Sequence, residues 1–251
     1  MTDAAVKVYF LGGLGEIGRN CMVIEQNRRL LIIDAGLMFP EPSMYGIDLI
    51  LPDFAWLKER ADRVDGIVLT HGHEDHTGAL RYLLRDVNAP IYGAPLTIGF
   101  ARHRLTEAKM DKNCTFVEVQ DNERRRIGEF DVEFIPVTHS VPSAHAIAIH
   151  TPIGIIVHSG DFKLDLSPID GRRTDMARLA ALGDAGVTLL MADSTNAEEP
   201  GFTASESTVG VTLRRLFLER PNRRLVVACF ASHLHRIQQI LDIARDQERK
   251  V

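Results

Sequence analysis

Three histidines and one aspartate lie within six residues of one another: His71, His73, Asp75 and His76. They come directly after the apolar run 66–70, which is typical of a β-strand, and a helix is predicted to follow them. A strand end is a place where a rigid scaffold can aim several side chains at one point. We therefore expect the first two histidines to bind one cation, and Asp75 and His76 to reach a second beside it. Imidazole and carboxylate ligands suit Zn²⁺ or Mn²⁺, with Mg²⁺ as a further candidate, and leave coordination positions open for water.

Two further ligands are predicted where later strands end. His139 follows the predicted strand 131–136, and Asp161 follows the predicted strand 154–158 after a short turn. Asp161 is the natural bridging ligand, because one carboxylate can bind two metal ions through its two oxygens. Two ions roughly 3.5–4 Å apart can hold a hydroxide and stabilise the charge that develops on a phosphate oxygen. These residues predict a dinuclear hydrolase.

Two more histidines lie close to these positions in the sequence, but their contexts favour structural roles. His158 belongs to an apolar strand and is predicted to pack or to support a ligand. His145 is a weaker candidate for a substrate contact, and a structural role is favoured for it as well.

The elements that must position these residues are short β-branched runs separated by turn signals, with helices between them. Strands are predicted at 6–11, 21–25, 30–34, 66–70, 91–93, 114–119, 131–136, 146–150, 154–158, 187–192 and 225–229. Helices are predicted at 57–63, 77–85, 208–219 and 234–249. Many antiparallel strands with helices between them imply an α/β protein of layered sheets covered by helices.

Composition excludes several classes of protein. The 251 residues are 45% hydrophobic and 25% charged, which fits one large domain or one domain plus part of another. There is no apolar run of the roughly 18–20 residues that a membrane span needs, and residues 1–10 lack a signal-peptide pattern, so we expect a cytoplasmic protein without a membrane partner. The three cysteines have no CxxC spacing and are predicted to be reduced. A net charge of −5 argues against a uniformly basic surface but allows a local basic cleft.

The predicted ligand set resembles that of the metallo-β-lactamase superfamily, which implies a four-layer αββα sandwich. The same set serves hydrolases of thioesters and lactones as well as nucleases, so it indicates chemistry more than substrate. Other stretches are similar to bacterial ribonuclease J: 11–20 (LGGLGEIGRN), 34–40 (DAGLMFP), 46–53 (GIDLILPD), 192–202 (ADSTNAEEPGF) and 229–239 (CFASHLHRIQQ).

This resemblance implies an enzyme that degrades single-stranded RNA. The expected activities are 5′-to-3′ exonuclease and endonuclease cleavage in RNA maturation and decay, with two Zn²⁺ ions and a hydroxide between them that attacks the phosphodiester. His71, His73 and His139 are expected to hold one ion, Asp75 and His76 the other, and Asp161 both. Asp75, which could also orient the hydroxide, and His76 are the predicted catalytic residues. A homodimer or tetramer is implied as well.

Some residues match the family's motifs less specifically. Gly46 and Asp48 match a stretch that helps to bind a structural Ca²⁺. Ser232, His233 and His235 match a segment that contacts the substrate phosphate and the terminal nucleotide, although the family usually has Asn where His233 stands.

The resemblance also implies a division of the chain. Residues 1–205 match a metallo-β-lactamase domain without its C-terminal return segment, and 206–251 match the beginning of a truncated β-CASP domain. Asp193 belongs to a segment that closes over the metal site in the family. The chain alone is expected to be a poor nuclease, because the second ion would lack one histidine ligand. Two alternatives stay open: a thioester or lactone hydrolase of the same fold, and a catalytically impaired RNA-binding fragment.

Overall fold

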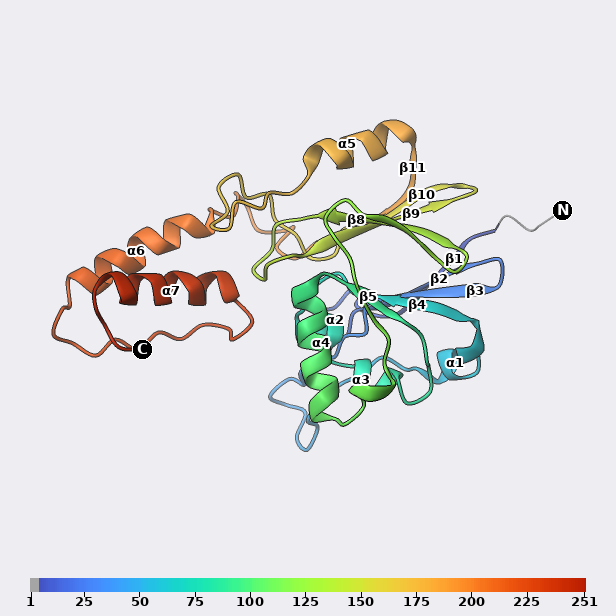
Figure 1. The fold of residues 1–251 in the computed structure, drawn as a ribbon, viewed down its shortest axis with the longest axis horizontal. Helices are drawn as coiled ribbons and strands as arrows, with labels where there is room; N and C mark the ends of the chain where they lie inside the picture. Colours follow the sequence, from blue (N-terminus) through green and yellow to red (C-terminus); the bar gives the residue numbers. More distant parts are fainter. Residues whose placement is uncertain (1–4) are drawn as a thin grey trace.

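A computed structural model describes residues 5–251 and contains two β-sheets packed face to face (Figure 1). Strands β1 to β3 of the first sheet are antiparallel neighbours, and β3 to β6 run parallel. In spatial order its strands are β1 (Lys7–Gly12), β2 (Cys21–Gln26), β3 (Arg29–Ile33), β4 (Val64–Val68), β5 (Ile91–Gly93) and β6 (Phe116–Glu118).

The second sheet has five strands, which pair antiparallel except for the parallel pair of β10 and β11. In spatial order these are β11 (Val187–Met191), β10 (Gly154–His158), β9 (His145–Thr151), β8 (Phe130–Pro136) and β7 (Arg124–Ile127).

Side chains that alternate along the strands divide the core into layers. In β3, Leu31 and Ile33 point between the two sheets, while Leu30 and Ile32 point to the helices on the outer face. A strand turns successive side chains to opposite faces, so an almost continuous apolar run is needed where both faces are covered. Each such side chain stabilises the fold by about 1.5–3 kcal/mol when it is fully buried.

Helices cover the outer faces of both sheets. The first sheet is covered by α1 (Ala55–Lys58), α3 (Leu80–Leu83) and α4 (Pro95–Glu107), whose apolar residues join its outer cluster, and α2 (Glu74–Thr77) is a single turn before α3. The second sheet is covered by α5 (Met176–Ala185) through Leu179 and Leu182. Short 3₁₀ turns lie at η1 (Ala61–Arg63) and η2 (Asp111–Asn113). This αββα order confirms the predicted fold class.

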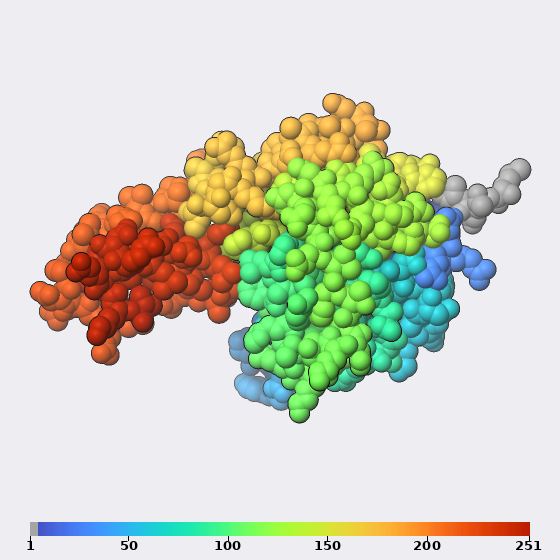
Figure 2. Space-filling view, viewed as in Figure 1, coloured from blue at the N-terminus to red at the C-terminus, as the bar shows by residue number. Residues whose placement is uncertain are grey.

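The last two helices form a separate lobe beside the sandwich (Figure 2). Helices α6 (Glu206–Leu218) and α7 (Leu234–Asp246) pack on each other through a small apolar cluster that includes Phe217 and Ile243. The predicted domain division falls at Ser205, whose side chain caps the first turn of α6. The division itself stays a prediction. No helix within residues 5–251 is long and apolar enough to cross a bilayer.

The structure corrects several predicted elements. Residues 225–229 do not form a strand, because they pair with no other strand within the described residues. The predicted helices 57–63 and 77–85 are broken into short pieces. The second breaks after α2, where backbone groups bond to Ala35 instead of continuing the helix: the carbonyl of His76 accepts from Ala35 N–H, and Ala79 N–H donates to the Ala35 carbonyl. Strand β7 and helices α4 and α5 were not predicted from the sequence.

Candidate metal centre

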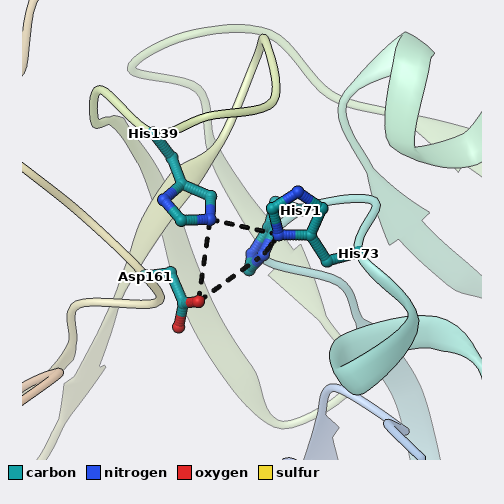
Figure 3. Close-up of side chains that lie close together, drawn as sticks. All are labelled: His71, His73, His139 and Asp161. Atoms are coloured by element: carbon teal, nitrogen blue, oxygen red, sulfur yellow. Dashed lines mark hydrogen bonds and ion pairs between the residues drawn. The ribbon is translucent and has the colours of Figure 1, made fainter. Parts of the chain in front are cut away.

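Four of the predicted ligands meet at one point from three separate loops (Figure 3). The ligand atoms of His71, His73, His139 and Asp161, called here the first group, all lie within 4.8 Å of one another. His73 Nδ1 lies 3.1 Å from His71 Nε2 and 3.1 Å from His139 Nε2. Asp161 Oδ2 lies 3.6 Å from His139 Nε2 and 3.9 Å from His71 Nε2.

These spacings fit the ligand shell of a single ion. Tetrahedral Zn²⁺ with bonds of about 2.0–2.1 Å places its ligand atoms roughly 3.3–3.4 Å apart. The two 3.1 Å contacts between nitrogens come within a few tenths of an ångström of that spacing. The first group therefore has both the donor types and the separations that a zinc ion needs.

Burial prepares the three imidazoles of the first group to act as ligands. Desolvation lowers the pKa of His71 well below its usual value and lowers the pKa of His73 as well. It also lowers the pKa of His139 to about 3, against the opposing field of Asp161. Neutral imidazole is the form that binds metal ions, so these rings do not have to lose a proton near pH 7.

A second group contains Asp75, His76 and the same Asp161. His76 Nε2 lies 3.2 Å from Asp161 Oδ1 and 3.5 Å from Asp75 Oδ2. Asp161 thus turns Oδ2 toward the first group and Oδ1 toward the second. Burial alone would raise the pKa of the Asp161 carboxyl, but the neighbouring His76 holds it well below its usual range. The arrangement suits a carboxylate bridge between two ions.

A buried chain of hydrogen bonds fixes how the rings are presented. Asp34, at the end of β3, accepts from His76 Nδ1 at 2.7 Å and from the Thr70 hydroxyl at 2.8 Å. Because that hydroxyl is used as a donor, its oxygen is left to accept from His71 Nδ1 at 3.1 Å. The Nε2 atoms of both rings then face the two ligand groups, and His76 follows the carboxylate–histidine–metal pattern. The side-chain amide nitrogen of Asn20 also lies 3.1 Å from His76 Nε2. Desolvation would lower the pKa of His76, yet Asp34 and Asp161 together raise it well above its usual value.

The backbone after β3 approaches the ligand loop so closely that only glycine fits at position 36. A Cβ built on Gly36 would lie 1.5 Å from the carbonyl oxygen of Asp75. The same carbonyl accepts from the backbone N–H of Asn20 at 2.9 Å and from its side-chain amide at 3.1 Å. No role was predicted from the sequence for Asp34, Gly36 or Asn20, although all three belong to the stretches that resemble ribonuclease J.

A cluster of charges holds the loop that carries His139. The Arg172 guanidinium bonds both oxygens of Asp121, at 2.7 and 2.9 Å, and the carbonyls of Val137 and Ala144, each at 2.9 Å. Buried His145 donates from Nε2 to Asp121 at 2.8 Å. In this structure His145 therefore takes part in fixing a loop, which is the structural role that the sequence favoured.

Removing Arg172 is expected to loosen this loop. Arg172→Ala deletes the bonds that join both ends of the loop to Asp121, and hydrogen bonds to charged groups are worth about 1.5–3 kcal/mol each. We expect the free energy of unfolding to fall by about 2–3 kcal/mol in denaturant titrations, together with a weaker affinity for the first metal ion. The neighbouring exposed Arg173→Ala is the control. Equal stability of the two variants would contradict this role.

Other predicted residues lie apart from the two groups. His158 accepts from the Gly160 backbone N–H at 3.0 Å, in a supporting position beside the ligands. Gly46 and Asp48 lie in an exposed loop, and within residues 5–251 the groups of three or more potential metal ligands do not include Asp48. Asp193 lines a cavity of about 860 Å³ beside the second group, and its side chain accepts from Thr195 N–H. A calcium site at Gly46 and Asp48 stays a prediction.

The predicted substrate-binding segment lies at the start of α7. His233 caps this helix by accepting from Arg236 N–H, and its Nε2 lies 3.5 Å from Glu206 Oε2. His235 Nε2 lies 3.0 Å from Asp170 Oδ2. Substrate contacts by Ser232, His233 and His235 stay predictions.

The chain is similar over its whole length to proteins named ribonuclease J. It is 45% identical to the one from Synechocystis over 98% of this chain and 44% identical to the one from Mycolicibacterium smegmatis over 100% of it. The one from Helicobacter pylori (strain J99) is 41% identical over 100% of the chain. The chain spans 39%, 45% and 36% of the length of these three relatives, respectively.

Solved structures and a family model agree with the fold. A protein of unknown function from Enterococcus faecalis superposes with a TM-score of 0.68 at 22% identity, covering 94% of this chain and 62% of that one. Unliganded yeast PDE1 has a TM-score of 0.54 at 14% identity, covering 97% and 94%. The model of the metallo-beta-lactamase superfamily matches residues 14–208, which include every residue of both groups. The chain therefore belongs to the metallo-beta-lactamase superfamily.

Proposed function

We propose that this chain is the metal-binding part of an enzyme of the ribonuclease J type, which hydrolyses single-stranded RNA. The observation that carries the hydrolytic centre is Asp161, whose two oxygens face two separate ligand groups. The substrate is inferred from the 41–46% identity to proteins named ribonuclease J. We further propose Zn²⁺ as the metal, 5′-to-3′ exonuclease and endonuclease cleavage in RNA maturation and decay, a cytoplasmic location and a homo-oligomer.

The chain's own residues would divide the work as follows. His71, His73 and His139 would hold one ion, and Asp75 and His76 the other. Two ions bound there supply Lewis acidity and a water that ionises near neutral pH. The carboxylate of Asp75 borders the second group, with Oδ2 at 3.5 Å from His76 Nε2, and can orient an attacking water there. The apolar core behind the ligands keeps their positions fixed before substrate arrives.

The substrate class is tested directly with the chain and zinc. Single-stranded RNA carrying a 5′-monophosphate and an end label is expected to give mononucleotides from the 5′ end together with internal fragments. A thioester is offered in parallel, and the full-length relative from Mycolicibacterium smegmatis is the positive control. Turnover is expected to be lower in this chain than in that relative, which is more than twice as long. Thioester hydrolysis with intact RNA would contradict the proposal.

Asp75→Ala is expected to lower RNA turnover by about 10²–10⁴-fold, the range that a positioned acid–base group contributes. The fold should survive, because the Asp75 side chain is part-exposed and its backbone carbonyl is still held by Asn20. The exposed Asp184→Ala on α5 is the matched control. Circular dichroism checks the fold and product formation checks the rate; unchanged turnover would rule out the assigned role of Asp75.

A further inference from the structure

The ligands of the second group lie in a helix that is too short to hold itself. Helix α2 runs only from Glu74 to Thr77, and Asp75 and His76 are its two central residues. A single helical turn is unfavourable in isolation, because it fixes several backbone torsions for one hydrogen bond. Its internal bonds are few: the His73 carbonyl accepts from the N–H groups of His76 and Thr77 and from the Thr77 hydroxyl, and the Glu74 carbonyl accepts from Gly78 N–H. The geometry of Asp75 and His76 therefore depends on contacts from outside the turn.

One guanidinium from α4 reaches both ends of this turn. Arg104 Nη2 lies 3.1 Å from Glu74 Oε1, and Arg104 Nη1 donates to the Thr77 hydroxyl oxygen. The planar fork of an arginine can make two such bonds with little further loss of freedom. Arg104 thus spans residues 74 and 77, with the two predicted ligands between them.

The same helix also contacts the first half of the ligand loop. A Cβ built on Gly72 would lie 2.5 Å from Phe100 Cδ2, so the Phe100 ring lies flush against the backbone between His71 and His73. Phe100 and Arg104 are four residues apart and share one face of α4. The helix is a firm support, since it has 13 residues and buries Ile98, Ala101 and Leu105 in the core.

We infer that α4 is a brace for the metal centre, in which Arg104 is a positioning residue for the second group and Phe100 for the first. This inference rests on the proposed two-metal centre. An ordinary surface ion pair contributes little to the stability of a fold. A residue that supports metal ligands from behind changes metal affinity by about 10–100-fold. If Arg104 is a brace, its removal should weaken metal binding strongly and change the stability of the metal-free protein only slightly. Removal of an ordinary surface ion pair should change neither much.

The test is a zinc titration of the metal-free chain against a competing chelator, which resolves the two binding steps. The step that is lost in Asp75→Ala identifies the second ion. Arg104→Ala is expected to weaken that step by about 10–100-fold and to leave the other within about threefold. Arg104→Lys should be intermediate, because a single ammonium cannot make the fork. Phe100→Leu should instead weaken the affinity for the first ion.

Arg102→Ala is the matched control, since its guanidinium lies on the same helix but over the Phe116 ring, with 5.0 Å to the centroid. Its two affinities and its melting temperature without metal should equal those of the parent chain. The brace is refuted if Arg104→Ala binds both ions as tightly as the control does. It is also refuted if Arg104→Ala loses affinity for both ions and its melting temperature without metal falls as well. A parent chain that takes up fewer than two ions refutes the two-metal centre, and the brace with it.

Discussion

Asp161→Asn is expected to reduce bound zinc from two ions to at most one and to lower RNA turnover by about a thousandfold or more. The carboxylate faces the first group through Oδ2 and the second through Oδ1. The amide that replaces it has one oxygen and no charge, so it cannot bridge two cations. Loss of a residue that merely supports a ligand already weakens metal binding by about 10–100-fold, and loss of a group that stabilises transition-state charge lowers rates by about 10²–10³-fold.

The substitution should leave the fold in place, because Asn has nearly the same shape and the Asp161 side chain is 29% exposed. Exposed Asp184→Asn makes the same chemical change away from the site. Elemental analysis after desalting measures the metal content, and end-labelled RNA measures the turnover. Two tightly bound ions in the Asp161→Asn chain would show that Asp161 is not the bridge. Loss of both metals from the Asp184→Asn chain would show that the assay reports general damage.

The gathering of these six residues could be predicted from the sequence because its signal is local. His71, His73, Asp75 and His76 stand together after a strand, and a tight cluster of this composition has few other uses. His139 and Asp161 lie 63 and 85 residues beyond His76. Each nevertheless follows an apolar run that is typical of a strand, so its position at a strand end could be predicted. The structure brings all six into two groups that share Asp161.

The residues that support the ligands could not be found in this way. Asp34 contacts His76, which is 42 residues away, and Arg172 bonds Asp121, 51 residues away. Charged residues are common, and nothing in the local pattern around Asp34 or Arg172 indicates which partner each will meet. Such pairs are set by which strands become neighbours and by how the two sheets pack, and the alternation of apolar residues leaves both open.

Helix α4 was missed for a related reason. Its buried stripe contains Thr97 and Ala101 beside Ile98 and Leu105, so the apolar period is weakened by a small residue and a polar one. Pro95 at the first helical position was the available signal, because proline is favoured there. Conversely, the predicted strand 225–229 has the right residue types but no partner within the described chain. A strand is defined by pairing, and pairing is a tertiary property.

Asp34→Asn is expected to weaken the affinity for the second metal ion by about 10–100-fold, because it changes the tautomer of His76. Asp34 Oδ2 accepts two protons, one from His76 Nδ1 and one from the Thr70 hydroxyl, while Oδ1 accepts the Thr70 backbone N–H. An asparagine that keeps the backbone bond must turn its NH₂ toward two donors. His76 can relieve the conflict only by moving its proton from Nδ1 to Nε2, which removes the lone pair that faces Asp75 and Asp161.

Asparagine is the informative substitution because it separates this effect from backbone strain. Asp34 has a φ of +61°, and asparagine tolerates that left-handed conformation as well as aspartate does. Asp65→Asn is the control, because it removes a different ion pair of the same sheet, the one between Asp65 on β4 and Arg29 on β3. At a pH above the raised pKa of His76, nitrogen chemical shifts of the metal-free chains should report its proton on Nε2 in Asp34→Asn and on Nδ1 in the parent chain. If the proton stays on Nδ1 and the second ion binds as before, then Asp34 does not set the orientation of the ligand.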